Sequence, residues 1–142
     1  MADDETAGLG ELVMRVARAQ RRRFREVLAP WDLSPHHARA LMVISARDGV
    51  RLSDLAERLR IAPRSATEVA DALQERHLVE RSPDPGDRRA VLLRVTDEGR
   101  AVRSEIDAAR VADSASFYGR LPAADRAELT RILSALADED GN

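Results

Sequence analysis

Two apolar segments separated by a dense turn are the sequence feature that most constrains the fold. Residues 78–81 and 90–95 have the composition and alternation of β-strands, and residues 82–87 between them are rich in Pro, Gly and Asp. This pattern predicts a β-hairpin with Arg88 and Arg89 near its tip. The other long segments have helical periodicity, so we expect a mainly α fold with a small β-hairpin, in the α+β class.

Two short helical patterns precede the hairpin. Ser53 and Asp54 are expected to cap the first helix, and Pro63 is expected to open the second after a turn at residues 60–62. Two short helices joined by a turn of this length are typical of a helix-turn-helix. Thr96 is expected to cap the helix that follows the hairpin, because acidic residues fill the first turn after it.

Longer helices are expected at both ends of the chain. Apolar residues recur at helical spacing over residues 9–29, and Pro30 should end that helix. Ser34 followed by Pro35 is typical of the start of the next helix. The first helix is long for the core of a small monomer, so a helix of a partner chain is a reasonable recipient for its apolar face.

The composition excludes several classes of protein. With 142 residues the chain fits one domain, and without cysteine it has no thiol chemistry and no disulfides. No apolar stretch is long enough to span a membrane, and the acidic N-terminus is unlike a secretory signal. We therefore expect a cytoplasmic protein that does not associate with a membrane.

The charge is unevenly distributed along the chain. The formal net charge is 23 − 25 = −2, and every one of the 23 basic residues is an arginine. Residues 15–25 hold six arginines and no acid, and residues 58–103 hold ten arginines against eight acids. Because a local basic face matters more for polyanion binding than the total charge, a nucleic-acid partner remains compatible with this composition.

Three segments carry a more specific pattern, and they comprise residues 52–59, 73–81 and 84–99. The most specific part is Asp87-x-Arg89, followed by an apolar strand and then by Thr96-x-x-Gly99. Together these segments resemble the MarR family of bacterial transcription regulators. The resemblance extends over nearly the whole chain, and the length of the chain fits it as well.

The resemblance implies a winged helix-turn-helix fold in a single domain of residues 1–142. Helices at about 9–29 and 97–140 would intertwine with those of a second copy, and the winged helix-turn-helix would occupy about residues 35–96. Such a homodimer would be a sequence-specific regulator, most often a repressor, at the bacterial nucleoid. Its double-stranded operator would be pseudo-palindromic, with half-sites about 10 base pairs apart.

The start of the second short helix is expected to meet DNA, because recognition helices lead with their N-terminal end. Arg64 could bridge guanine O6 and N7, and Glu68 could accept from cytosine N4. Ser65 and Thr67, beside Pro63, suit phosphates or a thymine methyl group. The alternative for each of these residues is an ordinary solvated helix surface.

In the wing, Arg89 is the expected minor-groove residue, because the negative potential of a narrow groove attracts arginine. The resemblance suggests that Asp87 either orients Arg89 through a salt bridge or hydrogen-bonds the turn. Arg88 and Arg94 are either phosphate contacts or plain solvated charges, and both alternatives stay open at this point.

Four residues of the DNA-binding part depart from the usual pattern of the family, and Ala38 stands where the family often has a bulkier residue. Ala62 stands where serine often caps the recognition helix, and His77 stands where glycine is common. Glu68 and Asp71 are acidic on a face that is often basic, which lowers the expected affinity for DNA phosphates.

The resemblance also implies a site for a small ligand whose binding releases DNA. It places part of that pocket at Trp31, His37 and Ala38, and Arg15 or Arg18 nearby would suit an aromatic anion. Ordinary core and surface roles are the alternative for these residues, and a solvated or interface role is the alternative for the arginines.

No motif indicates an enzyme. The sequence has no Gly-rich phosphate loop and no nucleophile-elbow motif, and the adjacent His36 and His37 cannot face the same way on a helix to bind a metal. We therefore expect no catalytic residues, no cofactor and no metal. The rival functions are a winged-helix module that binds protein, and a DNA-binding regulator that responds to no ligand.

Overall fold

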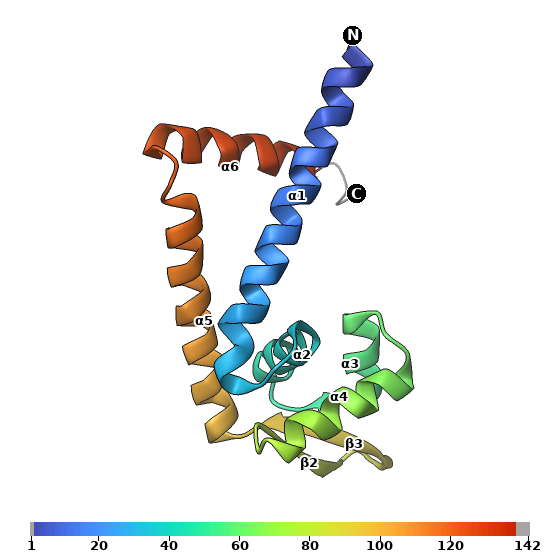
Figure 1. The fold of residues 1–142 in the computed structure, drawn as a ribbon. Coiled ribbons are helices and arrows are strands. Elements are labelled where there is room, and N and C mark those ends of the chain that lie inside the picture. Colours follow the sequence, from blue (N-terminus) through green and yellow to red (C-terminus); the bar gives the residue numbers. More distant parts are fainter. Residues whose placement is uncertain (1, 139–142) are drawn as a thin grey trace.

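The fold consists of a long helical arm and a smaller body that carries the sheet (Figure 1). The computed structural model describes the backbone of residues 2–138 and the side chains of residues 6–138. In chain order its elements are α1 (Ala2–Leu28), η1 (Ala29–Trp31), α2 (Pro35–Ser45), β1 (Val50–Arg51), α3 (Leu52–Leu59), α4 (Pro63–Glu75), β2 (Val79–Asp84), β3 (Asp87–Val95), α5 (Asp97–Tyr118) and α6 (Ala123–Asp138). In the arm α1 and α5 lie side by side, and α6 leaves the far end of α5 at a steep angle.

The N-terminal helix differs in extent from the expectation. It begins at Ala2 rather than at residue 9 and ends at Leu28, directly before a short 3-10 turn that contains Pro30. In the C-terminal region of 97–140, Thr96 and Pro122 predict the starts of two successive helices, and α5 and α6 confirm them, while residues 139–140 lie outside the described residues. No helix among the described residues combines the length and the apolar character that a membrane span requires.

The sheet has three antiparallel strands in the order β1–β3–β2. Val79 pairs with Val95, and Val50 pairs with Leu93. All four side chains are buried, so one face of the sheet covers the core. The predicted hairpin is confirmed, whereas the sequence does not indicate β1, because two residues are too few to show an alternation.

The hairpin is longer than expected, and its turn is shorter. β2 runs to Asp84 and β3 begins at Asp87, so the turn comprises residues 85–86 rather than 82–87. Pro83 lies inside β2, and the register shifts between it and the next residue. A proline is tolerated here because β2 is an edge strand, and among the described strands only β3 pairs with it.

Side-chain caps begin two of the helices as predicted. Oγ of Ser34 accepts from the backbone N–H of His37 (3.2 Å), and Nδ1 of His37 accepts from the backbone N–H of Ser34 (3.2 Å). The two residues form a capping box in which histidine replaces the usual Glu or Gln. At the start of α5, Oγ1 of Thr96 accepts from the backbone N–H of Gly99 (2.9 Å).

The predicted cap of α3 is wrong. This helix begins at Leu52, directly after β1, with Arg51 in the N-cap position and no side-chain hydrogen bond to the helix end. Ser53 and Asp54 lie inside the first turn, where the carboxylate still interacts favourably with the helix dipole. α4 also begins without a side-chain cap, because Ala62 occupies the N-cap position.

The core lies in the body, between α2, α3, α4, the sheet and the adjoining ends of α1 and α5. Its fully buried large side chains are Leu28, Leu41, Ile44, Leu55, Leu73, Val79 and Leu93. This core fixes α4 and the wing relative to each other.

The outer part of the arm exposes apolar side chains instead of burying them. Exposed large hydrophobic residues lie on α1 (Leu9, Leu12, Val13, Met14, Val16), on α5 (Val111) and on or just before α6 (Leu121, Ile132, Leu133, Leu136). Apolar side chains gathered in this way are typical of a surface that another molecule covers.

Candidate nucleic-acid interface

The N-terminal end of α4 presents polar side chains on its outer face. Arg64 and Glu68 have 92% and 70% of their side-chain areas exposed and form a loose ion pair, with 3.7 Å between Nε and Oε1. Oγ1 of the exposed Thr67 donates to the carbonyl of Pro63 (3.2 Å), whereas Ser65 is half-buried. Because an exposed pair of this kind contributes little stability, Arg64 is free to exchange its partner for a base or a phosphate.

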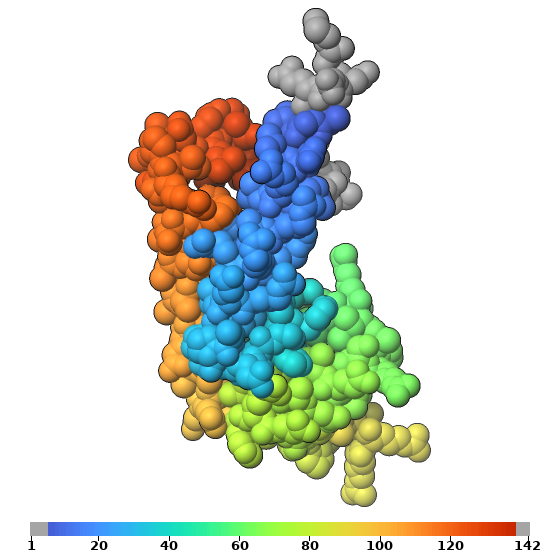
Figure 2. All heavy atoms as spheres, in the orientation of Figure 1, coloured from blue at the N-terminus to red at the C-terminus, as the bar shows by residue number. Residues whose placement is uncertain are grey.

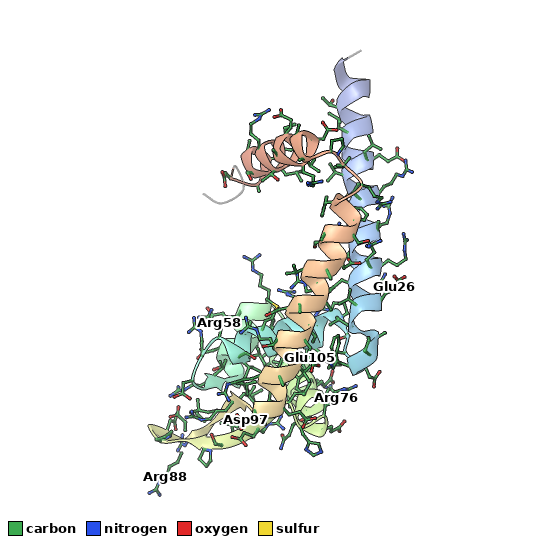
Figure 3. All side chains as sticks on the ribbon, turned by 90° about the vertical axis from the view of Figure 1, so that its left-hand side faces the viewer. Glu26, Arg58, Arg76, Arg88, Asp97 and Glu105 are labelled. Atoms are coloured by element: carbon green, nitrogen blue, oxygen red, sulfur yellow. The ribbon has the colours of Figure 1, made fainter. Side chains whose placement is uncertain are left out.

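Arg88 and Arg89 form the tip of the wing. Figure 3 shows Arg88 at the far end of the wing, and in Figure 2 the atoms around residue 90 project from the surface. Both arginines are exposed, and neither forms an ion pair with any residue between 6 and 138. Oδ1 of Asp87 accepts from the backbone N–H of Arg89 (3.0 Å). In the structure Asp87 therefore binds the backbone of Arg89 at the start of β3.

Arg94 does not share this freedom. Its NH1 is ion-paired with Oδ1 of Asp48 in the α2–β1 loop, and 35% of its side-chain area is exposed. Its guanidinium also lies against Gly49, whose φ is 94°. Arg94 was expected to be a phosphate contact or a solvated charge. In the structure a carboxylate of the chain, that of Asp48, pairs with it instead.

An ion pair that the sequence does not indicate joins the wing to α4. NH2 of Arg81 in β2 lies 2.6 Å from Oδ1 of Asp71 in α4, and NH1 of Arg81 donates to Gln74. Asp71 is thus neutralised, so it opposes DNA phosphates less than its charge alone suggests. No local pattern indicates this pair, because its partners lie 10 residues apart in two different elements.

A second ion pair braces the turn of the wing. NH2 of Arg51 in β1 lies 2.6 Å from Oδ2 of Asp84, and Oδ1 of Asp84 accepts from the backbone N–H of Gly86 (2.9 Å). The Gly86 hydrogen bond, and after it the Arg51 guanidinium, lowers the pKa of Asp84, although partial desolvation opposes them. The carboxylate therefore stays ionised and holds the turn that presents Arg89.

Arg58 in the last turn of α3 and Arg60 directly after this helix are candidates that the sequence does not single out. Both are exposed, and neither is ion-paired within the part of the chain whose side chains are described. Arg60 ends α3 in the left-handed conformation, with φ 54°. Arg58 and Arg88 lie on the same side of the molecule in Figure 3. Unpaired positive charge therefore lies at the α3–α4 turn as well as at the wing tip.

The residues expected to hold a small ligand are not brought together within one chain. Arg15 and Arg18 line a groove at the middle of α1, together with Phe117. Trp31 follows the other end of α1, and the helix between it and Arg18 is about 15 Å long. The indole Nε1 of Trp31 donates to Oε2 of Glu105 (3.1 Å).

His37 and Ala38 have structural roles. Ala38 is 3% exposed and belongs to the core of the chain. His37 is engaged in the capping box of α2. Its burial, and then the nearby charges of Arg76 and His36, lower the pKa of its imidazole, whereas Asp32 opposes them.

A cavity between α1 and α5 is not indicated by the sequence pattern. It is lined by Gln20, Arg21, Phe24, Val27, Arg110, Asp113 and Ser114. The guanidinium carbon of Arg110 lies 4.8 Å from the centroid of the Phe24 ring, a cation–π distance. The cavity therefore combines positive charge with aromatic surface.

The helix pair followed by an antiparallel hairpin defines a winged helix-turn-helix protein. Comparison with known proteins gives a more specific similarity within this class. Residues 33–91 match the model of the MarR family.

Three individual proteins illustrate the similarity. The HTH-type transcriptional repressor MdtR of Bacillus subtilis is 29% identical over 112 residues, which span 79% of this chain and 72% of MdtR. The HTH-type transcriptional repressor Rv2887 of Mycobacterium tuberculosis is 27% identical over 139 residues, which span 98% of this chain and 99% of Rv2887. The crystal structure of a MarR mutant from E. coli complexed with operator DNA is 26% identical and covers 93% of this chain and 95% of that one, with a TM-score of 0.73.

Proposed function

We propose that this protein is a transcriptional repressor that binds a specific double-stranded DNA sequence as a homodimer. The observation that carries the proposal is the wing tip, where Arg88 and Arg89 project from the body and are not ion-paired with any residue of the described range. The repressor names of its relatives and the operator complex of a MarR mutant support the same function.

The exposed apolar side chains of the arm support the homodimer. Leu9 and Leu12 on α1 and Leu136 on α6 are each more than half exposed, which is unfavourable in water unless another molecule covers them. A second copy supplies the same apolar faces, so the two arms can cover one another. In this proposal residues 9–29 and 97–140 form the dimer, and residues 35–96 form the DNA-binding part.

Within each half of the dimer, the N-terminal end of α4 enters the major groove. Arg64 reads a guanine, Glu68 reads a cytosine, and Ser65 and Thr67 contact the phosphates or a thymine methyl group, beside Pro63. The exposure of Arg64 and Thr67 supports these roles, whereas the partial burial of Ser65 gives it the least freedom to move.

The wing of each half reaches the adjacent minor groove. Arg89 enters the groove, Arg88 contacts a phosphate, and Asp87 fixes the turn that presents them. Arg94 is left out of this set, because Asp48 neutralises it. The unpaired Arg58 and Arg60 take its place as phosphate contacts.

Release of DNA by a small aromatic anion is the second part of the proposal. It is favoured by the cavity between α1 and α5, where Arg21 and Arg110 supply positive charge and Phe24 supplies a ring for stacking. A thermal-shift panel of aromatic acids tests it, with Arg110→Ala as the matched variant. An acid that raises the Tm of the wild-type protein and releases DNA supports the proposal, and a panel without any such acid contradicts it.

A gel-shift experiment tests DNA binding itself. The duplex is the DNA upstream of the gene for this protein, and a scrambled duplex of the same composition is the control. Sequence-specific retardation is expected. Absence of retardation even at low salt contradicts the proposal and favours the alternative of a winged-helix module that binds protein.

A further inference from the structure

Arg76 joins the end of α4 to the connection between α1 and α2. From the C-cap position of α4, its NH1 donates to the carbonyl of Ala72 (2.9 Å). Its Nε donates to the carbonyl of Asp32 (3.2 Å), and its NH2 donates to Oδ2 of the same aspartate (3.2 Å). One guanidinium therefore connects two parts of the chain that are 44 residues apart in sequence.

The residue before Asp32 reaches in another direction, to α5. Nε1 of Trp31 donates to Oε2 of Glu105 (3.1 Å), and Figure 3 shows Glu105 and Arg76 where the arm meets the body. Farther along the arm, α5 is held to α1 by the ion pair between Arg23 and Asp113 (2.8 Å). The adjacent residues Trp31 and Asp32 thus connect two helices, because Trp31 contacts α5 and Asp32 contacts the end of α4.

We propose that Asp32 and Arg76 are positioning residues, which hold α4 at a fixed angle to the arm and thereby set the half-site spacing that the dimer accepts. This inference rests on the proposed function, because the arms join the two copies and α4 reads the DNA. Neither residue needs to touch DNA for this role.

The local chemistry suits a rigid connection. Asp32 has a left-handed backbone, with φ 51°, which aims its carbonyl and its carboxylate at the same guanidinium. The planar fork of arginine can hold both oxygens and the end of α4 at once, which the single ammonium of a lysine cannot do with the same geometry. The side chain of Arg76 is 29% exposed and that of Asp32 is 95% exposed, so water competes for the carboxylate more than for the guanidinium, which the carbonyls of Asp32 and Ala72 also bind.

The spacing of an operator is a sensitive readout of this angle. Inserting one base pair between two half-sites moves them apart by about 3.4 Å and rotates one against the other by about 35°. A dimer whose recognition helices are firmly held must reject such a duplex. A dimer whose recognition helices can pivot tolerates it better.

The experiment compares two duplexes. One is selected from a randomised duplex library by the wild-type protein, and the other is the same duplex with one base pair inserted between the half-sites. For the wild type we expect a Kd ratio of about tenfold or more between them. For Asp32→Asn, which keeps a residue tolerant of the left-handed backbone, we expect this ratio to fall about threefold or more.

Asp107→Asn is the matched control, because it makes the same change in an ion pair between Arg103 and Asp107 that lies within α5. Its Kd ratio should equal that of the wild type. Acrylamide quenching of Trp31, the one tryptophan of the chain, provides a readout without DNA. Quenching should increase in Asp32→Asn and stay unchanged in Asp107→Asn.

The outcomes separate the inference from the proposed function. A merely structural role of Asp32 raises both Kd values by the same factor and leaves their ratio unchanged, which overturns the inference, as does unchanged quenching. A wild-type protein that selects no duplex overturns the proposed function and the inference together. Should Asp32→Asn fail to fold, Arg76→Lys takes its place with the same expected ratio and quenching.

Discussion

The carbonyl oxygen of Leu78 lies only 2.0 Å from the position that a β-carbon on Gly99 would occupy. This close approach brings the first turn of α5 against the junction between α4 and β2. Thr96 completes the contact, since its Oγ1 donates to the carbonyl of His77 (2.7 Å) and accepts from the N–H of Gly99 (2.9 Å). The Thr96-x-x-Gly99 motif therefore joins the arm to the end of α4.

We expect Gly99→Ala to destabilise the protein by about 2 kcal/mol or more, because backbone rather than a flexible side chain must move to accept the new methyl group. Urea denaturation measures the change. Gly10→Ala is the control, since a β-carbon at that helical position meets nothing within 4 Å. It should be neutral or stabilise by up to about 1 kcal/mol. Equal effects of the two substitutions would contradict this account of the motif.

His77→Gly should stabilise the protein by about 1 kcal/mol. His77 has φ 58°, a left-handed conformation that disfavours a β-carbon and that glycine adopts freely. His36→Gly makes the same change inside α2 and should destabilise by about 0.5–1 kcal/mol. The urea midpoint of each variant is compared with that of the wild type. A lower midpoint for His77→Gly would show that the imidazole contributes more stability than the left-handed backbone of His77 costs.

The capping box at Ser34 predicts a dependence of stability on pH. Nδ1 of His37 can accept from the Ser34 N–H only while it carries no proton, and the pKa of this imidazole is lowered from 6.5 mainly by burial. Between the lowered pKa and 6.5 the unfolded chain binds more protons than the folded one, so stability increases with pH. This contribution is complete above pH 6.5 and is lost as the pH falls through the folded-state pKa.

Urea midpoints between pH 5 and pH 8 test this expectation. His37→Gln keeps an acceptor at the third helical position but cannot titrate, so its midpoint should vary less with pH than that of the wild type. The remaining variation then comes from other groups. Identical pH profiles for the two proteins would remove His37 as the source of the dependence.

The wing arginines should differ in their contribution to DNA binding. Arg89→Ala should weaken binding to any duplex and lower the slope of log K against log salt by about 2, one phosphate equivalent for each protomer. Arg94→Ala should leave the slope unchanged, because Asp48 already neutralises this residue. A salt series measured by fluorescence anisotropy gives both slopes. Equal losses would show that Arg94 leaves Asp48 for a phosphate in the complex.

Local chemistry predicts much of this fold. The caps at Ser34 and Thr96 and the hairpin each depend on residues within a few positions of one another, so a single sequence contains the information. Pro83 was predicted to lie in the turn, but it lies inside β2. A proline is tolerated there because the strand is at the edge of the sheet, which the neighbouring residues in the sequence do not show.

The candidate site is less accessible to sequence reasoning than the fold. Arg94 and Asp48 are 46 residues apart in sequence, so no periodicity indicates that one neutralises the other. Ala38 is equally ambiguous, because a small residue on a helix suits a ligand cavity as well as a close contact in the core, and only packing distinguishes them. The sequence therefore does not show which arginines are ion-paired, because the partners are brought together only in the folded chain.

Selection from a randomised duplex library tests the central claim most directly. The full-length protein is incubated with the library at moderate salt, and the bound duplexes are sequenced after several rounds. The account predicts enrichment of a two-fold symmetric sequence with half-sites about 10 base pairs apart, centre to centre. Enrichment of a single unrepeated half-site, or no enrichment at all, would contradict it.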